Sequence, residues 1–195
     1  MQKSLDQGVK KVKQGFFGVS KRPEKILFLC YYDTREHLGL STISESIYYV
    51  QKLSQFPVHI VNLFEQRSGP KLSLDRGFNL NNFDVIVLHN ALAYDVNNLK
   101  DLDLESNTNI KNFEGLKVLL KQDENLYSAE VDEYIAGYGV DIVFTCISNK
   151  SDLHKVYPKS ISKGVHFQNM LTGYITPSLL SFLPNWQVKE RIFDV

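Results

Sequence analysis

The sequence predicts an α/β fold, a doubly wound and mostly parallel Rossmann-like sheet with helices on both faces. Six short apolar runs recur along the chain, separated by helical or irregular segments. The runs are rich in β-branched residues and lack polar alternation, as is typical of parallel strands that are covered on both faces. The connections are long enough for right-handed crossovers. We therefore expect an open sheet of five to seven strands.

The predicted strands lie within residues 25–32, 57–63, 84–90, 116–122, 140–146 and, more weakly, 164–170. Between the first two strands, four apolar residues fall on one face at helical spacing. These are Ile43, Ile47, Val50 and Leu53. A second helix fits Leu126 to Ala136, where Gly137 and Gly139 supply positive-φ positions for its end. The segments 65–82 and 91–113 are punctuated by Gly, Pro and Asn, and we expect loops with short helices there.

The composition fits one domain without charge-driven partners. Lys plus Arg equals Asp plus Glu, 22 each in 195 residues, so the net charge is zero. This argues against nucleic acid or an anionic membrane as a partner recognised by bulk charge. No apolar run has membrane-spanning length, and the N-terminus has no secretory apolar region, so we expect a cytoplasmic protein. Cys30 and Cys146 show no C-x-x-C spacing and predict buried, reduced thiols.

The chain divides into an N-terminal arm, residues 1–24, and a single Rossmann-like domain, residues 25–195. The arm alternates lysines with apolar residues. It is either a docked or frayed arm or a short amphipathic helix that makes peripheral membrane contact. The final residues, 192–195, have the pattern of a new strand. We therefore expect the domain to be the N-terminal half of a two-domain protein; the alternative is a short terminal helix packed on the sheet.

The carboxyl ends of the predicted strands hold the candidate binding residues. In an open parallel sheet, ligands bind there because the loops converge and helix N-termini point amide donors at the same crevice. The polar or aromatic side chains that follow these strands include Tyr32, Asp33, His89, Asn90, Gln122, Asp123, Glu124 and Thr145. A dense polar cluster, Lys121 to Asn125, follows the fourth strand, so we expect it to line the ligand-facing edge.

Several of these polar residues have a structural alternative to ligand binding. Asp123 or Asn125 could cap the helix that begins near Leu126. His89 could be a core histidine satisfied by a backbone carbonyl. Asp33 could belong to an ordinary solvated loop with Arg35 and Glu36.

Several motifs of common functions are absent from the sequence. It contains no G-x-x-x-x-G-K-[ST] loop, and no G-x-G-x-x-G follows the first strand, which disfavours phosphoryl transfer and ordinary dinucleotide binding. It contains no G-x-S-x-G elbow and no zinc-like ligand spacing. We therefore expect no cofactor and no metal.

Five short blocks resemble, in order, the N-terminal half of a group of bacterial glycosyltransferase-like proteins with two Rossmann-like domains, of the GT-B type. The blocks are DVIVLHN, EGLKVLLKQDE, YGVDIVFTC, HKVYP and LTGY. The resemblance covers Lys25 to Val195.

The resemblance implies the acceptor-side domain of a metal-independent glycosyltransferase. Its partners would be a glycan acceptor, cell-surface or lipid-linked, and a nucleotide-sugar donor held by a C-terminal domain outside this chain, so the isolated chain would be inactive. The residues implied as catalytic are Asp123, Glu124 and His89. The residues expected to bind the acceptor are Tyr32, Asp33, Asn90, Gln122, Thr145, Thr172 and Tyr174. The alternative is a non-catalytic flavodoxin-like binding or interaction module. The sequence does not define an oligomeric state.

Overall fold

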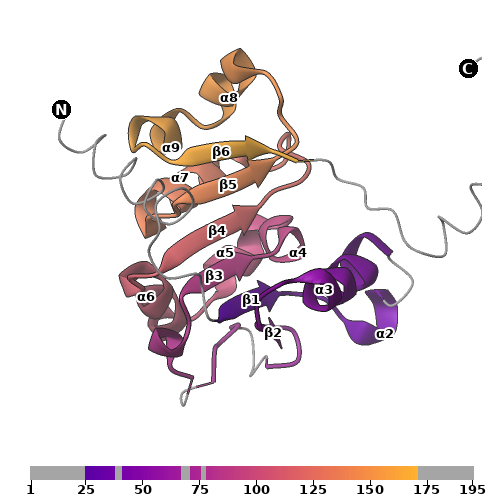
Figure 1. Cartoon of the computed structure of the whole chain (residues 1–195). Helices are drawn as coiled ribbons and strands as arrows, with labels where there is room; N and C mark the ends of the chain where they lie inside the picture. Colours follow the sequence, from indigo (N-terminus) through magenta and orange to yellow (C-terminus); the bar gives the residue numbers. More distant parts are fainter. Residues whose placement is uncertain (1–24, 38–40, 67–70, 76–77, 171–195) are drawn as a thin grey trace, which may run out of the picture.

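A parallel sheet organises the described part of the molecule. The computed structural model describes residues 25–37, 41–66, 71–75 and 78–170. The strands are β1 (Ile26–Cys30), β2 (Val58–Asn62), β3 (Val85–Leu88), β4 (Leu116–Leu120), β5 (Ile142–Thr145) and β6 (His166–Asn169). Their spatial order is β2-β1-β3-β4-β5-β6, and every neighbouring pair is parallel (Figure 1). Each strand lies inside one of the predicted apolar runs, so the predicted sheet is confirmed.

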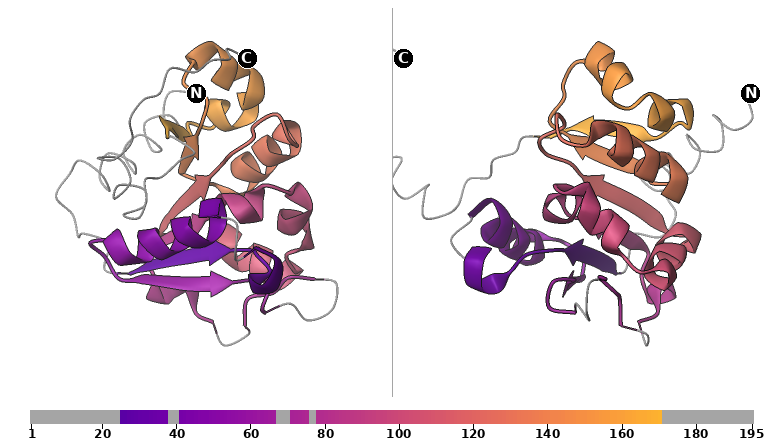
Figure 2. Two further views of the ribbon diagram at one scale, coloured as in Figure 1. Left: turned by 90° about the vertical axis from the view of Figure 1, so that its right-hand side faces the viewer. Right: turned by 180° about the vertical axis from the view of Figure 1, so that it is seen from behind.

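Helices cover both faces of this sheet. They are α2 (Thr34–His37), α3 (Ser41–Leu53), α4 (Asn90–Ala93), α5 (Val96–Asp101), α6 (Leu104–Asn112), α7 (Ser128–Tyr138), α8 (Lys150–Val156) and α9 (Pro158–Ser162), with a 3-10 turn η1 (Leu80–Asn82). Helix α3 lies on one face, and the helices from α4 to α9 lie on the other (Figure 2). The doubly wound α/β class is therefore confirmed.

The alternating residues of the strands explain why the runs are apolar throughout. Leu27 and Leu29 of β1 are fully buried in the cluster that includes residues of α4 to α7. Phe28 and Cys30, which point to the opposite face, pack with Ile47 of α3. Because both faces of β1 are covered, polar side chains are disfavoured on either face, and the strand lacks the polar alternation of a half-exposed strand.

Helix α7 differs slightly from the predicted helix. It begins at Ser128 and ends at Tyr138, so Gly137 lies inside the helix rather than at its end. Gly139 alone takes the left-handed C-cap, with φ of 66°, and its N–H donates to Ile135 O. A single left-handed glycine is enough to end a helix in this way.

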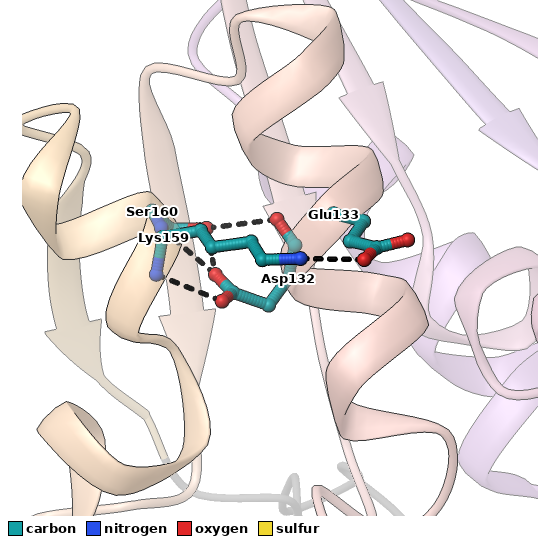
Figure 3. Close-up of polar contacts among 4 residues, drawn as sticks. All are labelled: Asp132, Glu133, Lys159 and Ser160. Carbon is teal, nitrogen blue, oxygen red and sulfur yellow. Dashed lines mark hydrogen bonds and ion pairs between the residues drawn. The ribbon is translucent and has the colours of Figure 1, made fainter.

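A buried carboxylate joins α7 to α9. Asp132 is 2% exposed and accepts hydrogen bonds from the backbone N–H groups of Lys159 and Ser160, at 2.9 and 2.8 Å (Figure 3). The hydroxyl of Ser160 also donates to it. Asp132 therefore caps the N-terminus of α9 from a different helix, which fixes the position of the connection between β5 and β6.

Among the described residues, no helix combines the length and the apolar character that crossing a bilayer requires.

Candidate functional site at the carboxyl edge of the sheet

The carboxyl ends of β3, β4 and β5 bring several predicted residues together. Asn90 begins α4 directly after β3, and its Nδ2 donates to Oε1 of Gln122, which follows β4. One strand further, Thr145 at the end of β5 donates to the carboxylate of Glu124. The four residues therefore form two contacting pairs along three adjacent strands, as the parallel sheet predicts.

Glu124 is held in a defined orientation. Its Oε1 accepts the hydroxyl of Thr145 and, at 2.7 Å, the backbone N–H of Cys146. Thr145 is fully buried and is itself fixed, because its Oγ1 accepts the backbone N–H of Ile147 at 3.2 Å. Within the described residues, Oε2 of Glu124 makes no hydrogen bond. One carboxylate oxygen is thus anchored and the other remains able to accept a proton or a hydrogen bond.

Lys121 shapes the loop that carries Glu124. Its side chain is 0% exposed, and its Nζ donates to the carbonyls of Gln122 at 2.7 Å and Asp123 at 3.4 Å. Burial lowers the pKa of Lys121, and the charges of Glu124 and Asp123 act in the opposite direction. Sequence reasoning placed Lys121 in the polar cluster but gave it no role. The available signal was a lysine that continues an apolar strand and precedes two carboxylates.

Asp123 does not cap α7. The helix starts at Ser128, its N-cap residue is Tyr127, and the side chain of Tyr127 makes no capping hydrogen bond. The cap alternative for Asp123 and Asn125 is therefore wrong. Instead, Asp123 has a left-handed backbone with φ of 52°, and its carbonyl accepts the N–H of Leu126 at 2.9 Å. Its exposed carboxylate lies in the turn between β4 and α7.

His89 has its two ring nitrogens engaged. Nδ1 accepts the N–H of Ala91 at 3.2 Å, so His89 is the N-cap of α4. Nε2 lies 3.1 Å from the hydroxyl of Ser46, which donates to the carbonyl of Ile43, so the network assigns the proton to Nε2. Burial lowers the pKa of His89 to about 4. This geometry fits the core-histidine alternative, with a backbone N–H and a serine hydroxyl as partners.

The predicted residues of β1 lie further along the same edge. Asp33 is buried and accepts hydrogen bonds from the backbone N–H and the guanidinium of Arg35, at 2.8 to 3.1 Å. The backbone of Tyr32 is held by the amide of Asn62, which joins the ends of β1 and β2. Strand β3 separates both residues from β4 and Glu124. Thr172 and Tyr174 lie outside the described residues.

Tyr157, at the junction of α8 and α9, buries a polar atom. Its side chain is 0% exposed, its ring stacks on Phe167, and its hydroxyl has no hydrogen-bond partner among the residues that the structure describes. Burial raises its pKa, and the charge of Glu124 raises it further. A buried hydroxyl without a partner costs free energy unless water or a ligand atom satisfies it. Sequence reasoning missed this residue because only the fold buries it.

The cysteines are free thiols. Cys30 is fully buried, as predicted, and burial raises its pKa to about 12. Cys146 is only half-buried, because it lies one residue beyond the end of β5. Burial raises its pKa too, and Glu124 adds to the effect. Both sulfurs are therefore protonated at neutral pH and are weak nucleophiles.

A cavity of about 340 Å³ lies at the opposite edge of the sheet, beside the C-terminus of α7. Its buried cation, Lys117, donates to the carbonyls of Ile110, Lys111 and Tyr138, at 3.3, 2.9 and 2.9 Å. These carbonyls end α6 and α7. Lys117 therefore satisfies carbonyl groups at the C-terminal ends of α6 and α7.

The arrangement at the carboxyl edge suits a neutral, hydroxyl-bearing ligand, since it offers an oriented carboxylate and a pair of amides. In the described part of the chain, no group of three His, Cys, Asp or Glu side chains is placed to hold a metal ion. Comparisons of the chain with protein-family models, with curated proteins and with solved structures found no match.

Proposed function

We propose that this domain binds a hydroxyl-rich acceptor at the carboxyl edge of its sheet, as the acceptor-side domain of a metal-independent glycosyltransferase. The observation that carries the proposal is the carboxylate of Glu124, with Oε1 anchored by Thr145 and Cys146 and Oε2 without a partner among the described residues. The order of the five sequence blocks supports it independently. The acceptor is a cell-surface or lipid-linked glycan.

In the proposed reaction, Glu124 acts as the general base. Oε2 accepts the proton of the acceptor hydroxyl while its oxygen bonds to the anomeric carbon of the donor. The bond from that carbon to the phosphate oxygen breaks, and the nucleoside diphosphate leaves with the electron pair. The amides of Asn90 and Gln122 orient neighbouring hydroxyls of the acceptor. A C-terminal domain outside this chain supplies the nucleotide-sugar, and the reaction takes place in the cytoplasm.

The test is the substitution Glu124→Gln in the full chain. Gln keeps an oxygen for Thr145 and Cys146 but cannot accept a proton, so the fold should persist. We expect the affinity for acceptor glycans, measured by titration calorimetry after an array screen, to fall at least about 10-fold. Turnover, in a form that carries the donor-binding half, should fall about 10²- to 10⁴-fold.

The matched control is Glu114→Gln, which changes an exposed glutamate before β4 at the opposite edge of the sheet. It should leave affinity unchanged. Equal affinity of the Glu124→Gln and wild-type chains would refute the proposal.

The alternative, a non-catalytic binding module, is favoured by one observation. The order β2-β1-β3-β4-β5 is that of flavodoxin-like folds. Glycan binding that depends on Glu124, with no transfer from any nucleotide-sugar in the two-domain form, would select this alternative.

A further inference from the structure

We propose that Tyr127 is a stacking platform for a pyranose ring bound beside Glu124. This inference rests on the proposed function and names the ligand class, a sugar in its ring form with an apolar C–H face. It adds a specificity-determining aromatic residue that the sequence patterns did not indicate.

Tyr127 is an exposed aromatic side chain without a structural task. It is 44% exposed. Within the described residues, its ring contacts no other ring and its hydroxyl makes no hydrogen bond. Most tyrosines in proteins bury the ring and satisfy the hydroxyl, because the ring contributes a large apolar surface. Folding therefore leaves a large part of this aromatic residue in contact with solvent.

The backbone at Tyr127 makes the residue choice more unusual. Its φ of 53° is left-handed, a conformation in which Gly and Asn are favoured and a bulky side chain is strained. Tyr127 is also the N-cap of α7, where Ser, Thr, Asp or Asn would stabilise the helix, and it makes no capping bond. Two local preferences thus disfavour tyrosine here, which points to a role other than folding.

The position of Tyr127 couples it to the proposed base. It follows Glu124 by three residues in the same turn, which the Leu126 N–H to Asp123 carbonyl bond closes at 2.9 Å. Lys121 holds the start of this turn through two carbonyls, and Thr145 and Cys146 hold Glu124. Tyr127 and Glu124 therefore belong to one preorganised turn.

The chemistry of a pyranose matches this combination. Its hydroxyl edge needs hydrogen-bond acceptors and donors, such as Glu124 and the amides of Asn90 and Gln122. Its C–H face carries slight positive charge and packs on the negative face of an aromatic ring.

The experiment compares Tyr127→Phe and Tyr127→Gly in the full chain. The probes are maltotriose, chitotriose and lactose, with sorbitol as a polyol that has hydroxyls but no ring face. Calorimetry and saturation-transfer NMR measure binding, and thermal unfolding measures stability. We expect at least one oligosaccharide, but not sorbitol, to bind the wild type. Tyr127→Phe should keep its affinity within about 2-fold, because the ring is retained.

Tyr127→Gly separates binding from folding. Glycine relieves the left-handed strain, so the unfolding midpoint should rise by roughly 2–4 °C, while affinity should fall at least about 10-fold. The control Tyr48→Ala removes a tyrosine of similar exposure, 53%, from α3 on the other face of the sheet, and should leave affinity unchanged.

The outcomes distinguish this inference from the proposed function. If Tyr127→Gly binds as tightly as the wild type while Glu124→Gln loses binding, the inference is overturned and the proposed function stands. A lower unfolding midpoint for Tyr127→Gly would assign the tyrosine a structural role and also overturn the inference. If no probe binds the wild type, both are rejected.

Discussion

His89 couples the stability of the fold to pH. The imidazole is 2% exposed, and burial lowers its pKa from 6.5 to about 4. The unfolded chain therefore binds a proton between these two pH values while the folded chain does not. The contribution of His89 to the free energy of unfolding should be constant above pH 6.5. It should decrease as the pH falls toward 4, by roughly 3 kcal/mol in total.

Urea unfolding between pH 4 and pH 7.5 measures this dependence. The variant His89→Asn keeps a side chain that can cap α4 but cannot be protonated, so its stability should depend less on pH over this range. The control His166→Asn changes an exposed histidine of β6 and should retain the wild-type dependence. If His89→Asn showed the same pH dependence as the wild type, His89 would not be the group that couples stability to pH.

The backbone conformation of Asp123 should affect stability, whereas its side chain should affect turnover if it takes part in catalysis. Its φ of 52° is one that Asn adopts readily, so Asp123→Asn should change the free energy of unfolding by less than about 0.5 kcal/mol. Asp123→Ala should be destabilising by about 1 kcal/mol, because alanine is strained in this conformation, and not because a helix cap is lost.

Turnover tests the side chain of Asp123 separately. If its carboxylate takes part in catalysis, Asp123→Asn in the two-domain form should lower the rate without changing stability. An unchanged rate would restrict the role of Asp123 to the turn. Glu124 would then be the carboxylate left to serve as the proposed general base.

At the scale of elements, the contact between α7 and α9 depends on one carboxylate. Asp132 accepts two backbone N–H groups and one hydroxyl in a buried place. Asp132→Ala would leave these donors without a partner, so we expect a loss of roughly 3 kcal/mol in the free energy of unfolding. Chemical denaturation measures the loss.

The neighbouring residue provides a matched control for this prediction (Figure 3). Glu133 pairs with Lys159 between the same two helices, but both side chains are more than half exposed. Glu133→Ala should therefore cost less than about 1 kcal/mol. Equal effects of the two substitutions would show that the buried cap of α9 contributes no more than the exposed ion pair.

For the whole molecule, the apolar pattern was sufficient to predict the sheet. All six strands lie within the predicted runs. Burial on both faces leaves a clear apolar signature in β1 and β3, whereas the edge strand β6 is mostly exposed and its run was the weaker one. The helix that begins at Ser41 was also visible, since its apolar residues repeat at helical spacing. Strands and helices depend on residues close in sequence, so the spacing of apolar residues is enough to predict them.

The candidate site could be predicted only in part. The pairs Asn90 with Gln122 and Glu124 with Thr145 follow from adjacent parallel strands, whose carboxyl ends converge. The positions of Tyr157 and Asp132 depend on contacts between residues far apart in the sequence, which leave no local pattern. The left-handed backbone of Asp123 and Tyr127 was also missed, because neither residue type requires it.

The strand order also constrains how this chain folds. Ile26 in β1 pairs with Val58 of β2 on one side and with Val85 of β3 on the other. None of the six strands described here pairs with a neighbour through a tight hairpin. Each pairing must close a long loop before it gains any stabilising contact, which slows the search for the native state. Refolding should therefore be limited by the docking of β1 between β2 and β3, and substitutions of Phe28 should slow refolding more than substitutions in β6, at the sheet's far edge.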